Sequence, residues 1–349
     1  MKTDILILLL ATFTACGAMP NDRDSGTQDA GNPFDAGNPF DAGSLDGGGP
    51  TCPNLQSGVD LVPTLDTAPT CADAMVAPLT LQYAAGADHQ LDLRVPRTGS
   101  GPFPTVIWIH GGGWRMGSRT DVQQAVRLVC SGYAVASIDY RLTTTAPFPA
   151  QIYDVKAAIR YLRANAQLRQ LDAQRFAAFG SSAGGHLAAL ATTSGGVAEL
   201  EDLSLGNPTF SSAVQAGVAW FAPTDLAQMD AQLLTQGCSS GSAHHGDPGS
   251  PESDLVGCTA SSASCAAAIR RANPITYVSA STPPLSMLHG SVDCTVPNMQ
   301  TTLLRQAMDA ASRCASKRSV VGASHGGPEF QSTAVQANVQ GFLDALFKP

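Results

Sequence analysis

The stretch RFAAFGSSAGGHLAALATT, at residues 175–193, decides the fold because it joins a strand pattern directly to a helix pattern. Arg175–Phe179 is an apolar run that predicts a buried strand, and Ala183–Thr193 predicts a helix. Between them, Gly180–Gly184 reads G-x-S-x-G and places Ser182 on the turn. A sharp strand-to-helix turn exposes a serine hydroxyl, and small residues are needed where the chain crowds itself. We therefore expect Ser182 to be a nucleophile.

The G-x-S-x-G pattern occurs twice more, and neither copy has this context. Ser239, in Gly237–Gly241, lies in a Ser/Gly/Cys-rich segment with no strand pattern before it. Ser324, in Gly322–Gly326, lies in a loop with no helix pattern immediately after it. A nucleophile on a strand-to-helix turn is therefore predicted only at Ser182.

Strand and helix patterns alternate along most of the chain. Repeated βα units predict an α/β fold, with a mostly parallel twisted sheet and helices on both of its faces. The first two strands flank Gly86 and read as a hairpin. Strands are expected at 79–83, 90–95, 105–110, 133–138, 175–179, 214–220, 284–289 and 319–321, and helices at 121–130, 149–166, 183–193, 297–311 and 335–347. Residues 224–272 interrupt the alternation and predict a Cys-containing insertion over the carboxyl edge of the sheet.

A glycine run follows the strand expected at 105–109. His110–Trp114 reads HGGGW, and glycines allow backbone N–H groups to turn toward a developing oxyanion. We expect the amides of Gly112, Gly113 and Ala183 to form this oxyanion hole. Loss of one such donor typically costs about 3–4 kcal/mol of transition-state stabilisation.

The general base follows by elimination among seven histidines. His325 lies in a glycine-flanked loop after the last strand, whereas His186, one helical turn past Ser182, is expected to be structural. In this class of fold the acid lies between the serine and the histidine in chain order. Asp293 follows the strand at 284–289 and is the predicted acid, and Asp225 is the alternative.

These residues predict acyl transfer without a cofactor. His325 would take the Ser182 proton while Asp293 fixes the imidazole tautomer, and water would then hydrolyse an acyl-enzyme. A metal site is not expected, since the spacing of Cys238, His244, His245 and Cys258 matches no common zinc pattern.

The N-terminal segment predicts export. Lys2 precedes the apolar run Ile5–Leu10, so residues 1–16 read as a signal peptide. Cys16 followed by glycine resembles a bacterial lipoprotein lipobox, which implies a lipidated Cys16 and attachment to the cell envelope, at the outer membrane or cell surface. Plain secretion is the alternative. Residues 17–50 contain AGNPFD twice, and this low-complexity composition predicts a flexible tether.

Cysteines are the next feature, because exported proteins commonly form disulfides. Residues 51–74 form a Cys-containing extension before the predicted catalytic domain at 75–349, and we expect Cys52 to pair with Cys71. Cys294 and Cys314 flank a helix whose length of roughly 20 Å excludes a bridge between them. Cys294 is instead expected to pair with Cys258 or Cys265.

Composition excludes some classes of function. The net charge is −8 and no Lys/Arg cluster stands out, so nucleic-acid binding is not expected. Hydrophobic residues make up 44% of the chain, which is enough for a sizeable core. The only expected membrane contact is the lipid anchor, and the sequence does not indicate an oligomeric state.

Several motifs, in order, resemble those of the hormone-sensitive-lipase-like esterases, and the bifunctional feruloyl/acetyl-xylan esterase type most closely. The matching motifs are HGGGW at 110–114, DYRL at 139–142, GSSAGGH at 180–186, PTDL at 223–226, HGSVDCTVP at 289–297 and SHGG at 324–327. The resemblance covers residues 75–348 and implies the α/β-hydrolase fold, with Ser182, Asp293 and His325 as the triad. Many lipase-like members carry Asp and Asn where this chain has Ser181 and His186, which favours the polysaccharide-esterase branch.

The expected function is hydrolysis of short-acyl esters, or of feruloyl or acetyl esters of polysaccharides. Trp114 and Trp220 are candidate substrate contacts. The alternatives are a general small-molecule esterase, an arylformamidase-like hydrolase and a catalytically silent surface module.

Overall fold

The computed structural model describes residues 60–63, 66, 71–122 and 124–348, and these include an eight-stranded sheet. The strand order is β1-β2-β4-β3-β5-β6-β7-β8. β2 pairs antiparallel with β1 and β4, whereas every other neighbouring pair is parallel. The strands are β1 Leu79–Gln82, β2 Gln90–Arg94, β3 Phe103–Ile109, β4 Ala134–Ile138, β5 Leu171–Ser181, β6 Ala216–Trp220, β7 Leu285–Gly290 and β8 Ala315–Val320.

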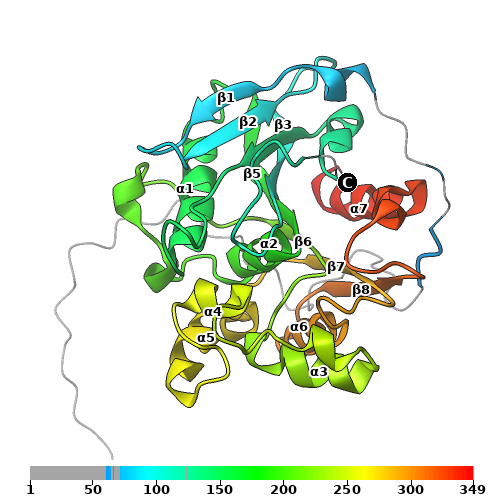
Figure 1. Cartoon of the computed structure of the whole chain (residues 1–349). Coiled ribbons are helices and arrows are strands. Elements are labelled where there is room, and N and C mark those ends of the chain that lie inside the picture. The colour runs from blue at the N-terminus through cyan, green and yellow to red at the C-terminus, as the bar shows by residue number, and fades with distance from the viewer. Residues whose placement is uncertain (1–59, 64–65, 67–70, 123, 349) are drawn as a thin grey trace, which may run out of the picture. The chain divides into compact units, whose positions relative to one another are not determined.

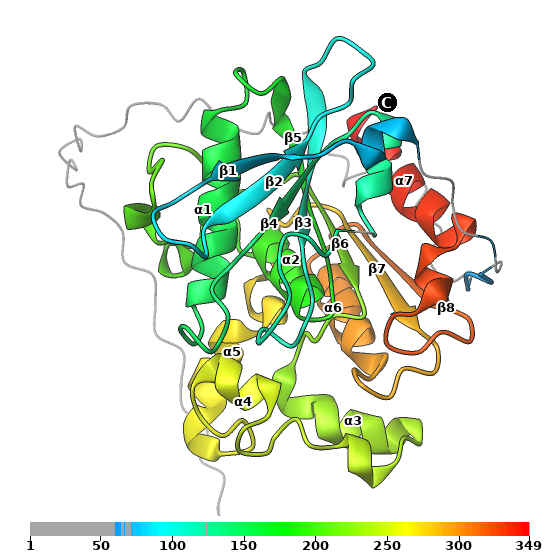
Figure 2. The ribbon, with the colours of Figure 1, turned by 45° about the horizontal axis from the view of Figure 1, so that its top comes forward.

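Helices cover both faces of this sheet, as Figures 1 and 2 show. The helices are α1 Ala150–Ala164, α2 Ala183–Thr193, α3 Met229–Gln236, α4 Pro251–Val256, α5 Ala266–Ala272, α6 Met299–Ala310 and α7 Thr333–Phe347. On one face, α1, α2 and α6 pack on the strands, and on the other α7 packs on Val106 and Phe179. Every residue of β3 is buried, as a parallel strand covered on both faces requires. The α/β prediction is confirmed.

The prediction of a regular helix over 121–130 is wrong in both its extent and its type. The chain there makes turns and then a 3-10 helix, η2 Val126–Ser131, which ends at Gly132 with φ 78°. The Ala125 amide bonds the Val122 carbonyl at 3.0 Å, and the Leu128 amide bonds Ala125 at 3.0 Å. Apolar residues three positions apart face the core in either kind of helix, so the spacing could not distinguish them.

Three described disulfides correct the expected pairings. Cys71 bonds to Cys130, so the predicted Cys52–Cys71 bond is wrong. Cys294 bonds to Cys238 rather than to Cys258 or Cys265, which bond to each other. The reason is the tertiary fold, which brings Cys238, just after the end of α3, to 5.6 Å from Cys294, Cα to Cα.

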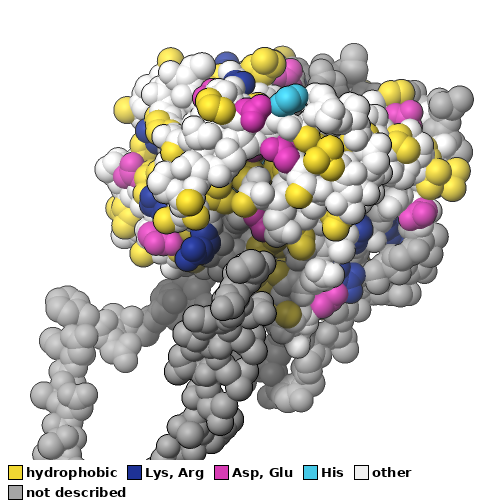
Figure 3. All heavy atoms as spheres, turned by 60° about the horizontal axis from the view of Figure 1, so that its bottom comes forward, with side chains coloured by type: hydrophobic (Ala, Val, Ile, Leu, Met, Phe, Trp, Pro, Cys, Tyr) yellow, Lys and Arg dark blue, Asp and Glu magenta, His cyan; other side chains and the backbone are white. Residues whose placement is uncertain are grey.

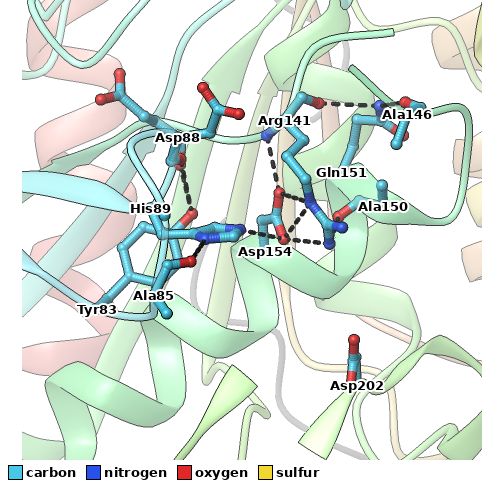
Figure 4. A network of polar contacts seen from close by, with 12 residues as sticks. Tyr83, Ala85, Asp88, His89, Arg141, Ala146, Ala150, Gln151, Asp154 and Asp202 are labelled. Carbon is cyan, nitrogen blue, oxygen red and sulfur yellow. Dashed lines mark hydrogen bonds and ion pairs between the residues drawn. The ribbon is translucent and has the colours of Figure 1, made fainter. Parts of the chain in front are cut away.

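A buried ion-pair network joins the β1–β2 hairpin to α1 (Figure 4). The Asp154 carboxylate lies 3.1 Å from His89 Nε2 and receives the Arg141 guanidinium at 2.7 and 2.9 Å. The backbone amide of Arg141 also donates to it, at 2.8 Å. Arg141 of the DYRL motif therefore has a structural partner that its sequence position did not reveal.

The side of the molecule that carries α3 to α6 is turned forward in Figure 3. Among the described residues visible there, Lys and Arg side chains are scattered and do not form a patch. Within residues 71–122 and 124–348, no helix is long and apolar enough to cross a membrane. The predicted signal peptide at 1–16 with Cys16, the tether at 17–50 and most of the extension at 51–74 lie outside the described residues.

Candidate active site

Ser182 lies on a strained turn between β5 and α2. Its backbone has φ 55° and ψ −124°, and its amide donates to the Trp220 carbonyl at 2.9 Å. A Cβ at Gly184 would lie 2.0 Å from the Ile109 carbonyl oxygen, and one at Gly180 would lie 2.2 Å from that of Gly184. Only glycine fits at both positions, so the motif forces the close chain crossing that exposes the serine.

Loops after three different strands bring Ser182, His325 and Asp293 together. His325 Nε2 lies 2.8 Å from Ser182 Oγ, and His325 Nδ1 lies 2.8 Å from Asp293 Oδ2. Phe221 packs edge-on against the imidazole, with 4.7 Å between ring centroids. In this hydrogen-bonded chain the imidazole can accept the serine proton while the carboxylate faces its other nitrogen.

Asp293 is fully buried and held in its ionised form. Burial acts to raise its pKa, but hydrogen bonds from His289 and His325 outweigh burial and hold the pKa well below the usual range. Its Oδ1 also accepts from the backbone amides of Thr295 and Val296, at 2.8 and 3.0 Å. The carboxylate is therefore charged at neutral pH and fixed in orientation.

His289 is the site residue that sequence reasoning missed. Its Nε2 lies 3.3 Å from Asp293 Oδ2 and 2.9 Å from the Val296 carbonyl. Its Nδ1 lies 2.5 Å from Thr301 Oγ1, which can donate to it. His289 and His325 thus contact the same carboxylate oxygen of Asp293, and His289 helps to orient it. The sequence signal that could have indicated this role is the position of His289 near the end of a buried strand, four residues before Asp293.

The HGGGW loop lies beside Ser182, where positive φ angles turn its backbone. Gly112 has φ 109° and Gly113 has φ 58°. A Cβ at Gly112 would lie 2.3 Å from the Met116 carbonyl oxygen, so glycine is required there. The amides of Gly112, Gly113 and Ala183 donate to no other described group. These amides are available to a negatively charged oxygen bound near Ser182.

A cavity of about 510 Å³ contains these groups. It is lined by Ser182, His325, residues 111–114 and Ala183, and also by His245, Pro251 and Glu252 from the insertion. Trp114 lines it, as expected of a substrate contact. Trp220 is not among its lining residues and packs against Phe179 and Phe330 in the core, so its assignment as a substrate contact is wrong. Successive residues of a strand point to opposite faces of the sheet, and the Trp220 side chain lies on the face that packs against Phe179 and Phe330.

The alternative residues have other partners. Asp225 caps the 3-10 helix η5 Leu226–Gln228, accepting from the Ala227 amide at 3.2 Å and from Asn273 Nδ2 at 3.1 Å. His186 Nε2 bonds the Ala272 carbonyl at 2.8 Å, and burial lowers the pKa of His186 to about 4. Ser239 Oγ lies 3.4 Å from Ser242 Oγ. None of these contacts involves His325.

The insertion does not present the Cys/His set considered for a metal. Cys238 and Cys258 are both in disulfides, so neither offers a thiolate. In the described part of the chain, no three His, Cys, Asp or Glu side chains are grouped as metal ligands would be.

The sheet order, the strained serine turn and the helices on both faces define an α/β-hydrolase fold. The BD-FAE family model matches residues 91–308, and the chain belongs to this family. It is similar to the esterase LipC of Mycobacterium tuberculosis, with 31% identity over 61% of this chain and 50% of LipC. It is also similar to the esterase LipQ of that organism, with 28% identity over 75% of this chain and 60% of LipQ. The chain thus matches about half to three fifths of these relatives' lengths.

Solved structures show the same fold. A truncated carbohydrate esterase from gut microbiota superposes with a TM-score of 0.67 at 28% identity, over 80% of this chain and 99% of that one. A bifunctional GH43-CE protein of Bacteroides eggerthii gives a TM-score of 0.65 at 34% identity, over 76% of this chain and 37% of that one.

Proposed function

We propose that this protein is a serine carboxylic ester hydrolase that works through an acyl-enzyme. The observation that carries the proposal is the hydrogen-bonded chain from Ser182 through His325 to Asp293, with 2.8 Å at each step. Membership of the BD-FAE family and similarity to proteins named esterases support it.

In this reaction His325 Nε2 removes the Ser182 proton as Oγ attacks the ester carbonyl. The amides of Gly112, Gly113 and Ala183 hydrogen-bond the oxyanion that forms. The protonated imidazole then gives its proton to the departing alcohol, leaving an acyl-serine. Water, deprotonated by His325, releases the acid and restores Ser182.

The proposed substrates are short-acyl esters, or acetyl and feruloyl esters of polysaccharides. Two structural relatives are described as a carbohydrate esterase and as a GH43-CE bifunctional protein, which supports a carbohydrate ester. The cavity wall includes His245, Glu252 and Thr295, which offer polar groups to a carbohydrate ester. Each buried methylene of a longer acyl chain contributes about 0.8 kcal/mol only if a long apolar groove exists.

The test is kcat/KM for p-nitrophenyl esters from acetate to palmitate, alongside release of acetate from acetylated xylan and of ferulate from methyl ferulate. We expect an optimum at the short end and product release from at least one carbohydrate or feruloyl substrate. An optimum at laurate or longer, with activation at a lipid interface, would contradict the proposal.

Replacement of the nucleophile tests the mechanism directly, and the serines of the other two motif copies provide matched controls. Ser182→Ala should lower kcat by roughly 10⁶-fold, because the acyl-enzyme can no longer form. Ser239→Ala and Ser324→Ala, in the other two G-x-S-x-G copies, should leave turnover close to that of the wild type. A Ser182→Ala variant with wild-type kcat would remove the proposed mechanism.

A further inference from the structure

A buried histidine–glutamate pair lies in the same cavity as Ser182, and no step of ester hydrolysis uses it. His245 Nδ1 lies 2.9 Å from Glu252 Oε1. The side chains are only 13% and 4% exposed, yet both residues line the cavity. Both come from the insertion, whose helices α3, α4 and α5 group together beside α2 and α6 in Figures 1 and 2.

One polar atom of the pair has no partner. Glu252 Oε2 is buried and hydrogen-bonds to no described residue, whereas the His245 ring also contacts the Thr295 backbone. Burial lowers the pKa of His245, but the hydrogen bond and charge of Glu252, together with the Asp230 charge and the Thr295 backbone, raise it overall. A buried carboxylate oxygen without a donor is costly, so a group that enters the cavity and donates to Glu252 Oε2 would remove that cost.

The backbone around the pair is held firmly in place. The Asp230 carboxylate accepts from the amides of His245 and Gly246, both at 2.8 Å. Ser250 Oγ donates to the His245 carbonyl at 2.6 Å and caps α4 by accepting from the Ser253 amide at 3.0 Å. Because Glu252 lies in the first turn of α4, its carboxylate is oriented before any ligand arrives.

The pair also lies next to the oxyanion loop. Arg115, which follows HGGGW, lies 2.5 Å from Asp254 of α4 and also donates to the Gly249 carbonyl. A Cβ at Gly113 would lie 3.4 Å from the Pro251 side chain, beside Glu252. A substrate whose carbonyl oxygen meets the Gly113 amide is therefore within reach of α4.

We propose that Glu252, held by His245, determines specificity by accepting a hydrogen bond from a hydroxyl group of the substrate. A neutral hydroxyl fits better than a charged group, because His245 already offsets the Glu252 charge and an acidic substrate would meet an unpaired carboxylate oxygen. This inference rests on the proposed ester hydrolysis and adds to it the feature of the substrate that is recognised.

The hydroxyl can belong to the alcohol, as in a sugar, or to the acyl group, as in a feruloyl ring. Two substrate pairs separate these sources. trans-2-Hydroxycyclohexyl acetate and cyclohexyl acetate differ by one hydroxyl on the alcohol. Methyl ferulate and methyl 3,4-dimethoxycinnamate differ by one free hydroxyl on the acyl group. For each ester, kcat/KM is compared between wild type and Glu252→Gln.

We expect Glu252→Gln to lower kcat/KM for the hydroxylated member of one pair by roughly 10- to 100-fold, the usual effect of losing a hydrogen bond to a charged group. The partner ester without the hydroxyl should change by less than about 3-fold. Asp247→Asn, which removes a charge from the same insertion at a side chain that is 61% exposed, should alter neither ester.

Equal losses for both members of both pairs, or no loss for any, would overturn the role of Glu252 and leave ester hydrolysis intact. A wild-type protein that hydrolyses none of the four esters would instead overturn the proposed function, and this inference with it. If Glu252→Gln does not fold, the double variant His245→Leu/Glu252→Met removes both buried polar groups together and leaves no unpaired partner. This double variant is also expected to lower kcat/KM for the hydroxylated ester of one pair while changing little for its partner without the hydroxyl.

Discussion

At the scale of single residues, the acid of the triad is distinguished from its alternative by what each carboxylate bonds. Asp293 Oδ2 faces His325 Nδ1 at 2.8 Å, and its Oδ1 is fixed by two backbone amides. The Asp225 carboxylate instead caps a short helix and accepts a hydrogen bond from Asn273. Both follow a strand in the sequence, so only the three-dimensional contacts separate them.

Asp293→Asn should therefore reduce kcat far more than Asp225→Asn. We expect a loss of roughly 10⁴-fold for Asp293→Asn, because an asparagine amide no longer stabilises the protonated imidazole or its tautomer. Asp225→Asn should remain within about 10-fold, since the amide oxygen can still cap the helix. Both are measured with p-nitrophenyl acetate on variants whose thermal unfolding shows a folded protein. The reverse ranking would assign the acid to Asp225.

At the scale of elements, the sequence predicted the strands and long helices because burial imposes a period on them. A strand is present at each of the eight expected places, although β8 Ala315–Val320 begins four residues before the expected 319–321, and α2 has the expected bounds. Serine and histidine of the site were readable because glycines and their place after strands mark them. The role of His289, the disulfide partners and the orientation of Trp220 could not be predicted from the sequence, because they depend on which loops the fold brings together. The insertion helices were missed since α3, α4 and α5 are short and depend on tertiary contacts.

The Cys238–Cys294 disulfide ties the insertion to the loop that carries Asp293. It closes a separation of 56 residues, whereas Cys258–Cys265 closes only 7. Loop-closure entropy predicts losses of about 4 and about 2.5 kcal/mol in the free energy of unfolding when each is removed. We expect Cys238→Ser/Cys294→Ser to unfold at lower denaturant and to lose kcat. Cys258→Ser/Cys265→Ser is the matched control, and a larger stability loss there would contradict this ranking.

The network in Figure 4 predicts a pH-dependent contribution to stability from the contact between the hairpin and α1. The hydrogen bond with Asp154 raises the pKa of His89, and this outweighs the opposing effect of burial. The Tyr83 ring packs 5.4 Å away. Because the folded pKa is raised, the stabilisation is fully present below the unfolded pKa of about 6.5. It is lost as pH rises through the folded pKa.

His89→Gln keeps a donor toward Asp154 but does not titrate in this range. The difference in free energy of unfolding between wild type and His89→Gln should therefore be largest below about pH 6.5 and should shrink as pH rises. Urea unfolding at a series of pH values measures it. His244→Gln, at a side chain that is 62% exposed, is the control for replacing a histidine by glutamine elsewhere in the chain. A His89→Gln difference that grew with pH would reverse the sign argued here.

At the scale of the whole molecule, every group assigned to the chemistry lies within residues 110–325. The cavity, the oxyanion loop and the triad are built from loops after β3, β5, β7 and β8 together with the insertion. The groups assigned to the chemistry are therefore separate in the sequence from the predicted lipobox at Cys16.

We propose that Cys16 is lipidated and that residues 17–50 tether the catalytic domain to the cell envelope. The lipobox-like sequence ending at Cys16 supports this, and the anchor would consist of acyl chains rather than a membrane-spanning helix. Cys16→Ser should move the protein from the membrane fraction to the soluble fraction, while kcat/KM on p-nitrophenyl acetate stays within about 2-fold, because Cys16 lies far along the chain from the site. Intact mass of the mature wild-type protein provides the direct measurement. A mass without a lipid increment, or a Cys16→Ser variant that remains in the membrane fraction, would exclude the anchor and favour plain secretion.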